Sequence, residues 1–228
     1  MKKLLILLTV CVCSFAQTKA VSPVPSLLRP SSLTRKAPEE FKVRFTTTKG
    51  DVVLQIHRDW APRGADRFYN LVRYAFFTDV AFFRVIPGFM AQFGMSPDPK
   101  ISAAWEPASI MDDPVKHSNT RGTITFAATS APNSRTTQLF INFANNAPLD
   151  KSGFAPIGEV IEGMDVVDKI NPEYREQPDQ GQITAAGKPY LDRNFPHLDY
   201  IKKAVIVPET APAGTDKAAP KAATTAKQ

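Results

Sequence analysis

The sequence predicts a mainly β domain, either an antiparallel sandwich or a closed barrel. Short strand-like runs recur along the chain, and only two segments have the apolar spacing of a helix. Many short strands with few helices are typical of antiparallel architectures rather than of parallel α/β sheets. Periodicity alone does not choose between the sandwich and the barrel.

The size and composition indicate one folded domain with tails. The chain has 228 residues, of which 43% are hydrophobic and 22% are charged. These values are typical of a soluble globular protein, and the chain is too short for two full-sized domains. We place the domain at residues 39–207, after a Pro- and Ser-rich linker at 17–38. The tail at 208–228 is rich in Ala, Pro, Thr and Lys and is expected to be disordered.

The first predicted element of the domain is a β-hairpin. Residues 41–45 and 52–56 alternate apolar and polar side chains, as half-buried strands do. The sequence Lys49-Gly50-Asp51 between them supplies turn chemistry.

Two helices are predicted. Pro62 suits a first helical turn, and the apolar residues after it are spaced for one face of a helix that runs to about Tyr74. A second, short helix is expected from Met164 to Ile170. The remaining strand-like runs are Ala81 to Val85, Met90 to Phe93, Thr123 to Ala127, Leu139 to Phe143, Ile157 to Val160 and Ala204 to Val207.

The N-terminus has the pattern of a secretory signal peptide. The basic pair Lys2-Lys3 precedes an apolar stretch, Leu4 to Val12, that is shorter than the roughly 20 residues needed to span a bilayer. The small side chain of Ala16 fits cleavage after it. We therefore expect 1–16 to be a signal peptide and the mature protein to be periplasmic or secreted, without stable membrane insertion.

Both cysteines, Cys11 and Cys13, lie in this leader. Cleavage after Ala16 leaves a mature chain without cysteine, which excludes disulfide, thiol-nucleophile and Cys-zinc chemistry. Lipid anchoring at Cys11 is the alternative. Val10 disfavours it, because this side chain is bulkier than the small residue expected before a lipidated cysteine.

Charge and motifs argue against several function classes. The 28 basic and 22 acidic side chains leave a formal charge of +6, a weak excess that does not indicate nucleic-acid binding. Phosphate-loop, nucleophile-elbow and dinucleotide motifs are absent from the sequence. The histidines, His57, His117 and His197, are far apart in the sequence, so no metal site is expected. The pair Asp112-Asp113 is interpreted as solvated in a loop.

The stretch from Phe82 to Gly94, FFRVIPGFMAQFG, places Arg84 and Gln92 among large apolar side chains. General statistics favour a core strand whose arginine reaches the surface. The stretch, however, closely resembles the signature F-x-R-(V/I)-I-P-G-F-M-x-Q-x-G of the cyclophilin prolyl isomerases.

Two later blocks resemble the same family, Gly122 to Phe140 and Gly153 to Val167, the second in the form of its bacterial branch. The resemblance is collinear from Glu40 to Val207. It implies a closed eight-stranded antiparallel barrel, capped by two α-helices, with an open groove on one face.

The resemblance also implies the activity of a peptidyl-prolyl cis-trans isomerase that assists the folding of exported proteins. Rotation about an X-Pro bond breaks amide resonance, which gives an uncatalysed barrier of ~18–20 kcal/mol. Such a rotation needs no cofactor. The expected partners are proline-containing segments of unfolded or partly folded proteins, and we expect the protein to act as a monomer.

The resemblance assigns roles to individual residues. Arg84 matches the donor that stabilises the twisted amide, and Gln92 matches the residue that holds the substrate backbone. The implied catalytic residues are Arg84, Phe89 and Gln92, and the implied substrate-binding residues are Met90, Ala128, Phe140, Leu149 and Phe154.

Three positions depart from the family pattern. Pro148 replaces the tryptophan or phenylalanine that often precedes the residue matching Leu149, and Phe154 stands where the family has a pocket histidine. Cyclosporin binding is therefore not implied. Phe83 replaces the histidine before the arginine, and alternation along a strand directs its side chain away from the groove.

The segment from Gln177 to Leu198 is longer than the connection of a minimal family member. It contains Gly181, Gly187 and three prolines, so a loop is expected. This loop is either a surface feature without a role or a contact site for a protein partner.

A function from a different class stays open, namely a non-catalytic proline-binding or chaperone module on the same barrel. Arg84 and Gln92 favour catalysis, whereas Pro148 and Phe154 are compatible with binding alone.

Overall fold

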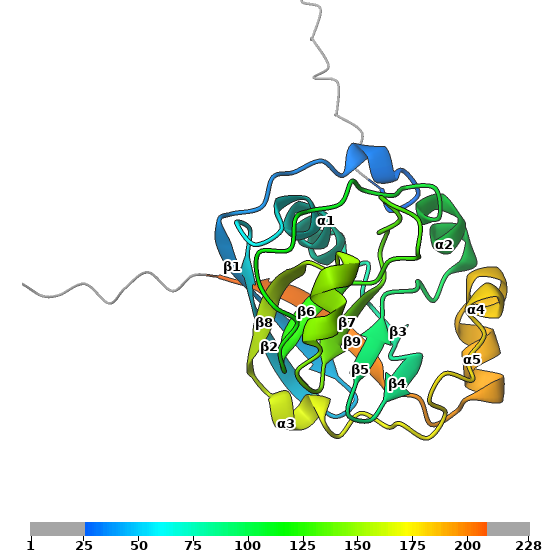
Figure 1. Ribbon diagram of the computed structural model, residues 1–228. Coiled ribbons are helices and arrows are strands. Elements are labelled where there is room, and N and C mark those ends of the chain that lie inside the picture. Colours follow the sequence, from blue (N-terminus) through cyan, green and yellow to red (C-terminus); the bar gives the residue numbers. More distant parts are fainter. Residues whose placement is uncertain (1–25, 209–228) are drawn as a thin grey trace, which may run out of the picture.

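The computed structural model describes residues 26–208, and these form one curled sheet of nine antiparallel strands with helices around it (Figure 1). The strands lie in the order β3-β9-β1-β2-β8-β6-β7-β5-β4. Their bounds are β1 Glu40–Thr47, β2 Gly50–His57, β3 Val80–Ala81, β4 Arg84–Ile86, β5 Met90–Phe93, β6 Thr123–Phe126, β7 Leu139–Asn142, β8 Pro156–Glu162 and β9 Tyr200–Val207.

The expected strand from Ala81 to Val85 is interrupted, so the sheet has nine strands where eight were expected. Phe82 and Phe83 separate β3 from β4, and the backbone N–H of Phe82 donates to the carbonyl of Asp199 instead. β3 and β4 are the two edges of the sheet, yet only two residues lie between them. The sheet therefore curls until its first and last strands are nearly consecutive in the chain.

The described residues contain five α-helices rather than the expected two. The predicted helix at Pro62 is confirmed as α1, and the predicted short helix forms only one turn, α3. The segment expected as a loop folds as two helices, with the side chain of Asp179 capping the first. The helices are α1 Pro62–Arg73, α2 Pro99–Trp105, α3 Met164–Val167, α4 Gln180–Ala186 and α5 Lys188–Asn194, with 3-10 turns at Pro30–Ser32 and Ala147–Ser152.

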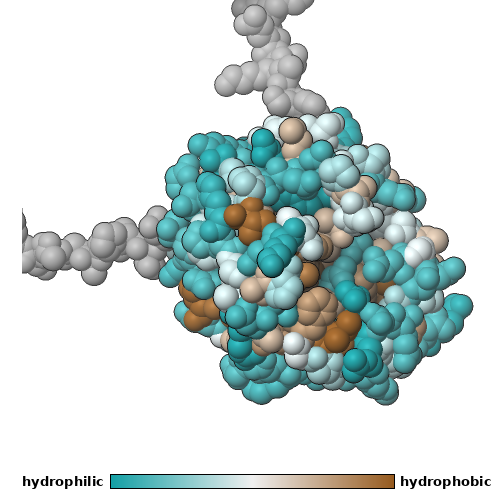
Figure 2. Space-filling model, in the orientation of Figure 1, coloured by the Kyte–Doolittle hydropathy of each residue, from teal (hydrophilic) through white to brown (hydrophobic). Residues whose placement is uncertain are grey.

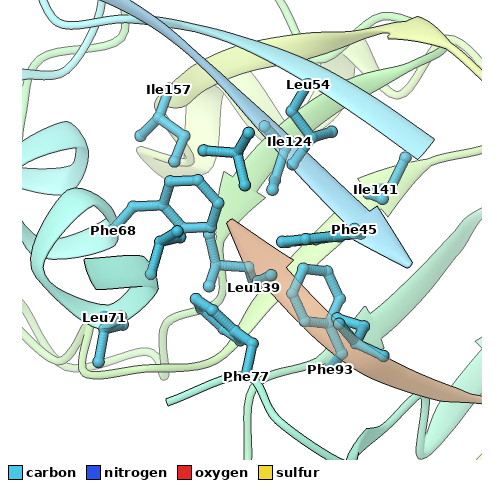
Figure 3. Packing of buried hydrophobic residues seen from close by; sticks show 14 of the residues in the cluster. Phe45, Leu54, Phe68, Leu71, Phe77, Phe93, Ile124, Leu139, Ile141 and Ile157 are labelled. Carbon is cyan, nitrogen blue, oxygen red and sulfur yellow. The ribbon is translucent and has the colours of Figure 1, made fainter. Parts of the chain in front are cut away.

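The main apolar core, here called the sheet core, fills the inside of the curl (Figure 3). Its centre is a group of phenylalanines. The ring of Phe45 packs edge-on against Phe93, with centroids 5.7 Å apart, and against Phe68 of α1 at 6.2 Å. Helix α1 contributes its apolar face to this core through Phe68 and Leu71. Buried apolar side chains of β1 and β2, which lie in the predicted alternating runs, also belong to this core.

A second apolar group, here called the outer cluster, lies on the other face of β3 and β9. Ala81 and Tyr200 belong to it, whereas the adjacent residues Val80 and Ile201 face the sheet core. Successive side chains of a strand point to opposite faces, so both groups can be built on the same two strands. The members of the outer cluster are Ala81, Phe83, Ile183, Leu191, Phe195, Leu198 and Tyr200.

The part of the expected linker that the structure describes, 26–38, packs against the domain. Leu33 and Ala37 are buried, and the indole N–H of Trp105 donates to the carbonyl of Leu27 at 2.9 Å. The expected signal peptide, the start of the linker and the tail from residue 209 lie outside the described residues. Within 26–208, none of the helices combines the length and the hydropathy needed to cross a bilayer.

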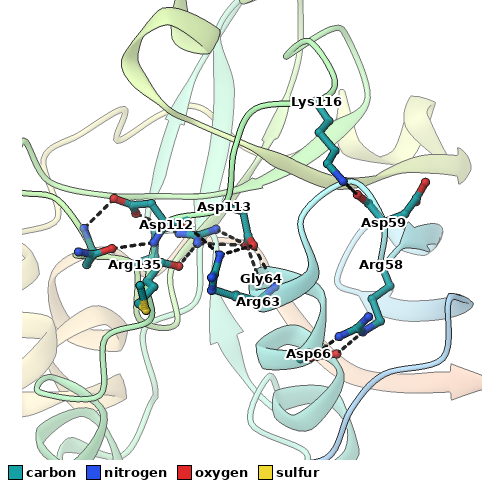
Figure 4. Close-up of polar contacts among 11 residues, drawn as sticks. Arg58, Asp59, Arg63, Gly64, Asp66, Asp112, Asp113, Lys116 and Arg135 are labelled. Atoms are coloured by element: carbon teal, nitrogen blue, oxygen red, sulfur yellow. Dashed lines mark hydrogen bonds and ion pairs between the residues drawn. The ribbon is translucent and has the colours of Figure 1, made fainter.

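The interpretation of Asp112-Asp113 as a solvated pair is wrong for Asp113, which is only 4% exposed (Figure 4). Its carboxylate accepts hydrogen bonds from the backbone N–H groups of Arg63 and Gly64 at 3.1 and 2.9 Å, and pairs with Arg135 at 3.1 Å. Ala61, at the N-cap position of helix α1, offers no side-chain hydrogen bond to the helix. A carboxylate from a distant loop therefore satisfies the start of this helix and its positive dipole end.

Candidate active site

A groove of about 660 Å³ runs between the edge of the sheet at β4, β5 and β7 and the helices α2 and α4. In the space-filling view, apolar surface gathers in the hollow at the middle of this face, with hydrophilic residues around it (Figure 2). All eight residues that the sequence assigns to the site line this groove, namely Arg84, Phe89, Met90, Gln92, Ala128, Phe140, Leu149 and Phe154. Their individual roles stay predictions.

Strand register places the two predicted polar residues side by side. Arg84 of β4 is the direct partner of Gln92 of β5, and Gln92 is in turn the partner of Phe140 of β7. Directly opposed residues of antiparallel strands share one face of the sheet. Arg84 accordingly donates from Nη1 to Oε1 of Gln92 at 3.2 Å. The three residues form a line across three strands, from a cation to an aromatic ring.

The apolar end of the groove is built from loops as well as strands. The rings of Phe140 and Phe154 pack edge-on with centroids 5.9 Å apart. Leu149 lies in the 3-10 turn before Phe154, whose backbone N–H donates to the Leu149 carbonyl. The side-chain amide of Asn146 holds the carbonyl of Phe89 at 2.9 Å. Phe154, which replaces a polar family residue, thus adds an aromatic wall to the pocket.

A buried asparagine that the sequence did not reveal holds this apolar end. Asn119 is fully buried, and its amide donates to Asp150 at 2.7 Å and to the carbonyl of Phe154 at 2.8 Å. Burial alone would raise the pKa of Asp150, but hydrogen bonds from Ser118 and Asn119 outweigh it and hold this pKa below its usual range. The ionised carboxylate therefore anchors the turn that carries Leu149.

The polar end of the groove contains a continuous series of hydrogen-bonded side chains, here called the polar row. Arg84 donates from both Nε and Nη2 to Oε2 of Glu176, each at 3.1 Å. Beyond Gln92, the amide of Gln92 donates to Gln138 at 2.8 Å, and Gln138 donates to Gln180 at 3.2 Å. Glu176 and Gln180 come from the segment before and within α4. No local pattern in the sequence marks either residue, so neither was assigned a role.

Near helix α2 the groove is lined by an aromatic residue, on which a partly buried arginine packs. Trp105 lines the groove, and the guanidinium of Arg67 lies over its ring, 4.9 Å from the centroid. Burial, with a smaller effect from Arg135, lowers the pKa of Arg67 to about 10. Arg67 therefore stays charged at neutral pH. It donates to the carbonyls of Ala108 and Thr136, which ties both of these loops to α1.

These features define a peptide-binding β protein, with an apolar pocket at one end of its groove and fixed N–H donors beside it. Within residues 26–208, His, Cys, Asp and Glu form no group of three that could hold a metal ion. Donors at fixed positions next to an apolar pocket suit the recognition of a chain segment that combines a backbone amide with an apolar ring.

Comparison with known proteins agrees with this class. Residues 42–188 match the family model described as "Cyclophilin type peptidyl-prolyl cis-trans isomerase/CLD". Peptidyl-prolyl cis-trans isomerase B of Escherichia coli is 36% identical over 176 residues, which cover 73% of this chain and 99% of the relative. A peptidyl-prolyl cis-trans isomerase of Acinetobacter baylyi is 39% identical over 141 residues, which cover 56% of this chain and 70% of the relative.

Solved structures show the same fold. A cyclophilin from Hirschia baltica superposes with a TM-score of 0.57 at 22% identity, over 78% of each chain. A cyclophilin-type isomerase from Cryptosporidium parvum gives a TM-score of 0.56 at 19% identity, over 75% of this chain and 99% of that one. The chain belongs to the cyclophilin-type peptidyl-prolyl cis-trans isomerase family, and its activity is that of a peptidyl-prolyl cis-trans isomerase.

Proposed function

We propose that Arg84 is the transition-state donor of this isomerase and that the enzyme serves proteins exported from the cell. The observation that supports the first part is the register of β4, β5 and β7, which lines up Arg84, Gln92 and Phe140 in one groove. The second part rests on the sequence pattern of the leader.

The chemistry of the reaction explains why a fixed arginine is useful. A planar X-Pro amide has little electron density to offer at nitrogen, whereas the twisted transition state regains a lone pair there. A donor beside that nitrogen stabilises the twisted state more than the planar one, which lowers the barrier. Arg84 is always charged, and it is held by the strand register rather than by a mobile loop.

The remaining groove residues bind the substrate on both sides of that donor. Phe89, Met90, Phe140, Leu149 and Phe154 supply the apolar pocket for the proline ring, and Ala128 lines the neighbouring part of the groove. Gln92 offers hydrogen bonds to the substrate backbone. A related Cryptosporidium parvum structure was determined in the presence of the dipeptide Ala-Pro, which supports proline-containing segments as the ligand class.

We infer three finer properties. All eight site residues come from one chain, which supports a monomeric enzyme. β3 and β4 lie two residues apart at opposite edges of the sheet, which supports a barrel closed by one interrupted strand. The basic and apolar leader supports a periplasmic or secreted location, where partly folded exported proteins present X-Pro bonds.

The decisive experiment measures cis-to-trans exchange of a short X-Pro peptide by the mature chain. Replacing Arg84 with alanine is expected to lower the rate about 10²–10³-fold, as the loss of a transition-state donor does. Arg73→Ala is the matched control, because this exposed arginine of α1 contacts Tyr69 rather than the groove.

Peptide binding separates this proposal from the non-catalytic alternative. Trp105 lines the groove, so its fluorescence reports binding when Trp60 is replaced by phenylalanine. We expect Arg84→Ala to retain binding and lose catalysis. If the wild type binds the peptide but accelerates its exchange no more than Arg84→Ala does, the chain is a binding module instead.

A further inference from the structure

The segment before α4 lies along the free edge of β4. This strand ends the sheet and pairs with β5 on one side only. On its other side, the backbone N–H of Val85 donates to the carbonyl of Arg175 at 2.9 Å. Because Arg175 adjoins this edge, the next residue, Glu176, lies beside Arg84.

The backbone at this point has an unusual conformation. Arg175 has a φ of +50°, in the left-handed region that residues other than glycine rarely adopt. Its N–H donates to the carbonyl of Pro172 at 3.1 Å, and the N–H of Gln177 donates to Tyr174 at 2.8 Å. Such a conformation persists where surrounding contacts impose it, and it is concentrated at functional sites.

The contacts of Glu176 determine which donors Arg84 has left. A guanidinium carries five N–H donors in a rigid plane. Glu176 accepts from two of these donors and Gln92 from one, which leaves two donors for a substrate. Because the carboxylate holds Nε and Nη2 together on one edge, it sets the rotation of the plane about its last bond and hence the direction of the remaining donors.

The other end of the polar row is held by the same part of the chain. Gln180, the first residue of α4, contacts Gln138, whose own partner is Gln92. Helices α4 and α5 are seated by the outer cluster, in which Phe83 packs with Ile183 and Leu191. The segment thus contacts the polar row at both ends.

We propose that Glu176 is a positioning residue that orients the guanidinium of Arg84 for catalysis, and that α4 and α5 stabilise this arrangement. The inference deepens the proposed function and rests on the role of Arg84 in it. The Glu176 side chain is 64% exposed and that of Arg84 is 30% exposed. Ion pairs this accessible to water contribute little to folding, so a purely stabilising role does not account for the arrangement.

The test compares three variants at Glu176 and at a control position. Glu176→Ala is expected to lower kcat about tenfold, because a misdirected catalytic group loses rate without losing substrate affinity, and to leave KM within about twofold. Glu176→Gln keeps an acceptor oxygen and is expected to recover part of the rate. Glu173→Gln is the matched control, since Glu173 lies three residues earlier and pairs with His197 outside the groove.

A double-mutant cycle with Arg84 shows whether the two residues act as a unit. If Glu176 acts through Arg84, Glu176→Ala has no further effect in the Arg84→Ala background. Thermal unfolding of each variant tests whether the fold is intact. If Glu176→Ala is unstable, Glu176→Gln replaces it in the cycle.

The outcomes distinguish this inference from the proposed function. If Arg84→Ala loses activity while Glu176→Ala and Glu176→Gln keep the wild-type kcat, the positioning role is overturned and the catalytic role of Arg84 stands. A change confined to KM also overturns it, because that result assigns Glu176 to substrate binding. If Arg84→Ala itself keeps full activity, the proposed function fails first.

Discussion

The two apolar groups of this molecule differ in how they relate to the active site. In the sheet core, phenylalanine rings pack against one another inside the curl and hold the strands together. The outer cluster is small, lies outside the sheet and seats only α4 and α5. The first group specifies the fold, whereas the second brings Glu176 and Gln180 to the groove.

The two groups meet at the break between β3 and β4. Phe82 belongs to the sheet core, Phe83 belongs to the outer cluster, and Arg84 follows directly. Three consecutive side chains therefore face the sheet core, helices α4 and α5, and the groove. Phe83, which stands where the resemblance expects a histidine, does not line the groove and instead supplies an apolar contact for α4 and α5.

The largest expected effect comes from the sheet core. Phe45→Ala removes a fully buried ring that packs on Phe68, Phe77 and Phe93. We expect the free energy of unfolding to fall by about 3–5 kcal/mol, because the ring leaves a cavity that its neighbours fill only in part. Urea unfolding followed by circular dichroism measures this. A loss below about 1 kcal/mol would contradict the central position of Phe45.

A smaller and local effect is expected from the outer cluster. Ile183→Ala removes a buried side chain of α4, and we expect the local unfolding free energy of α4 and α5 to fall by about 2–3 kcal/mol. Amide hydrogen exchange should become faster in α4 and α5 while β1 stays protected. The kcat should fall as in Glu176→Ala. Equal loss of protection in β1 would show that the two apolar groups unfold as one unit.

The smallest effect is a pH dependence of stability from Asp150, at the apolar end of the groove and apart from the outer cluster. The pKa of Asp150 is held below its usual range by hydrogen bonds from Ser118 and Asn119, so the folded protein favours the ionised form. The stability from this carboxylate is complete above its unfolded pKa of about 3.9 and is lost as the pH falls through the folded value.

The measurement compares urea unfolding of the wild type with Asp150→Asn across this range. The difference in unfolding free energy should be constant near neutral pH and shrink below about pH 4, because only the wild type loses a charge there. A difference that does not change with pH would mean that Asp150 contributes through its shape alone.

Local patterns were enough for the elements that face the sheet core. The alternation in residues 41–45 and 52–56 predicted the β1–β2 hairpin, and the spacing after Pro62 predicted α1, because one face of each element is buried. Helices α4 and α5 were not predicted. Each has seven residues and only one buried side chain, Ile183 or Leu191, which is too few for a helical period to show.

The sequence by itself determined which residues line the groove, through the collinear resemblance of the chain to the cyclophilin family. The tertiary structure decided the partners of the polar and charged groups. Glu176 contacts Arg84 across 92 positions, and Asp113 reaches the start of α1 across 49. A hydrogen bond depends on distance in space and leaves no local period in the sequence, so only the folded chain reveals what holds Arg84 in place.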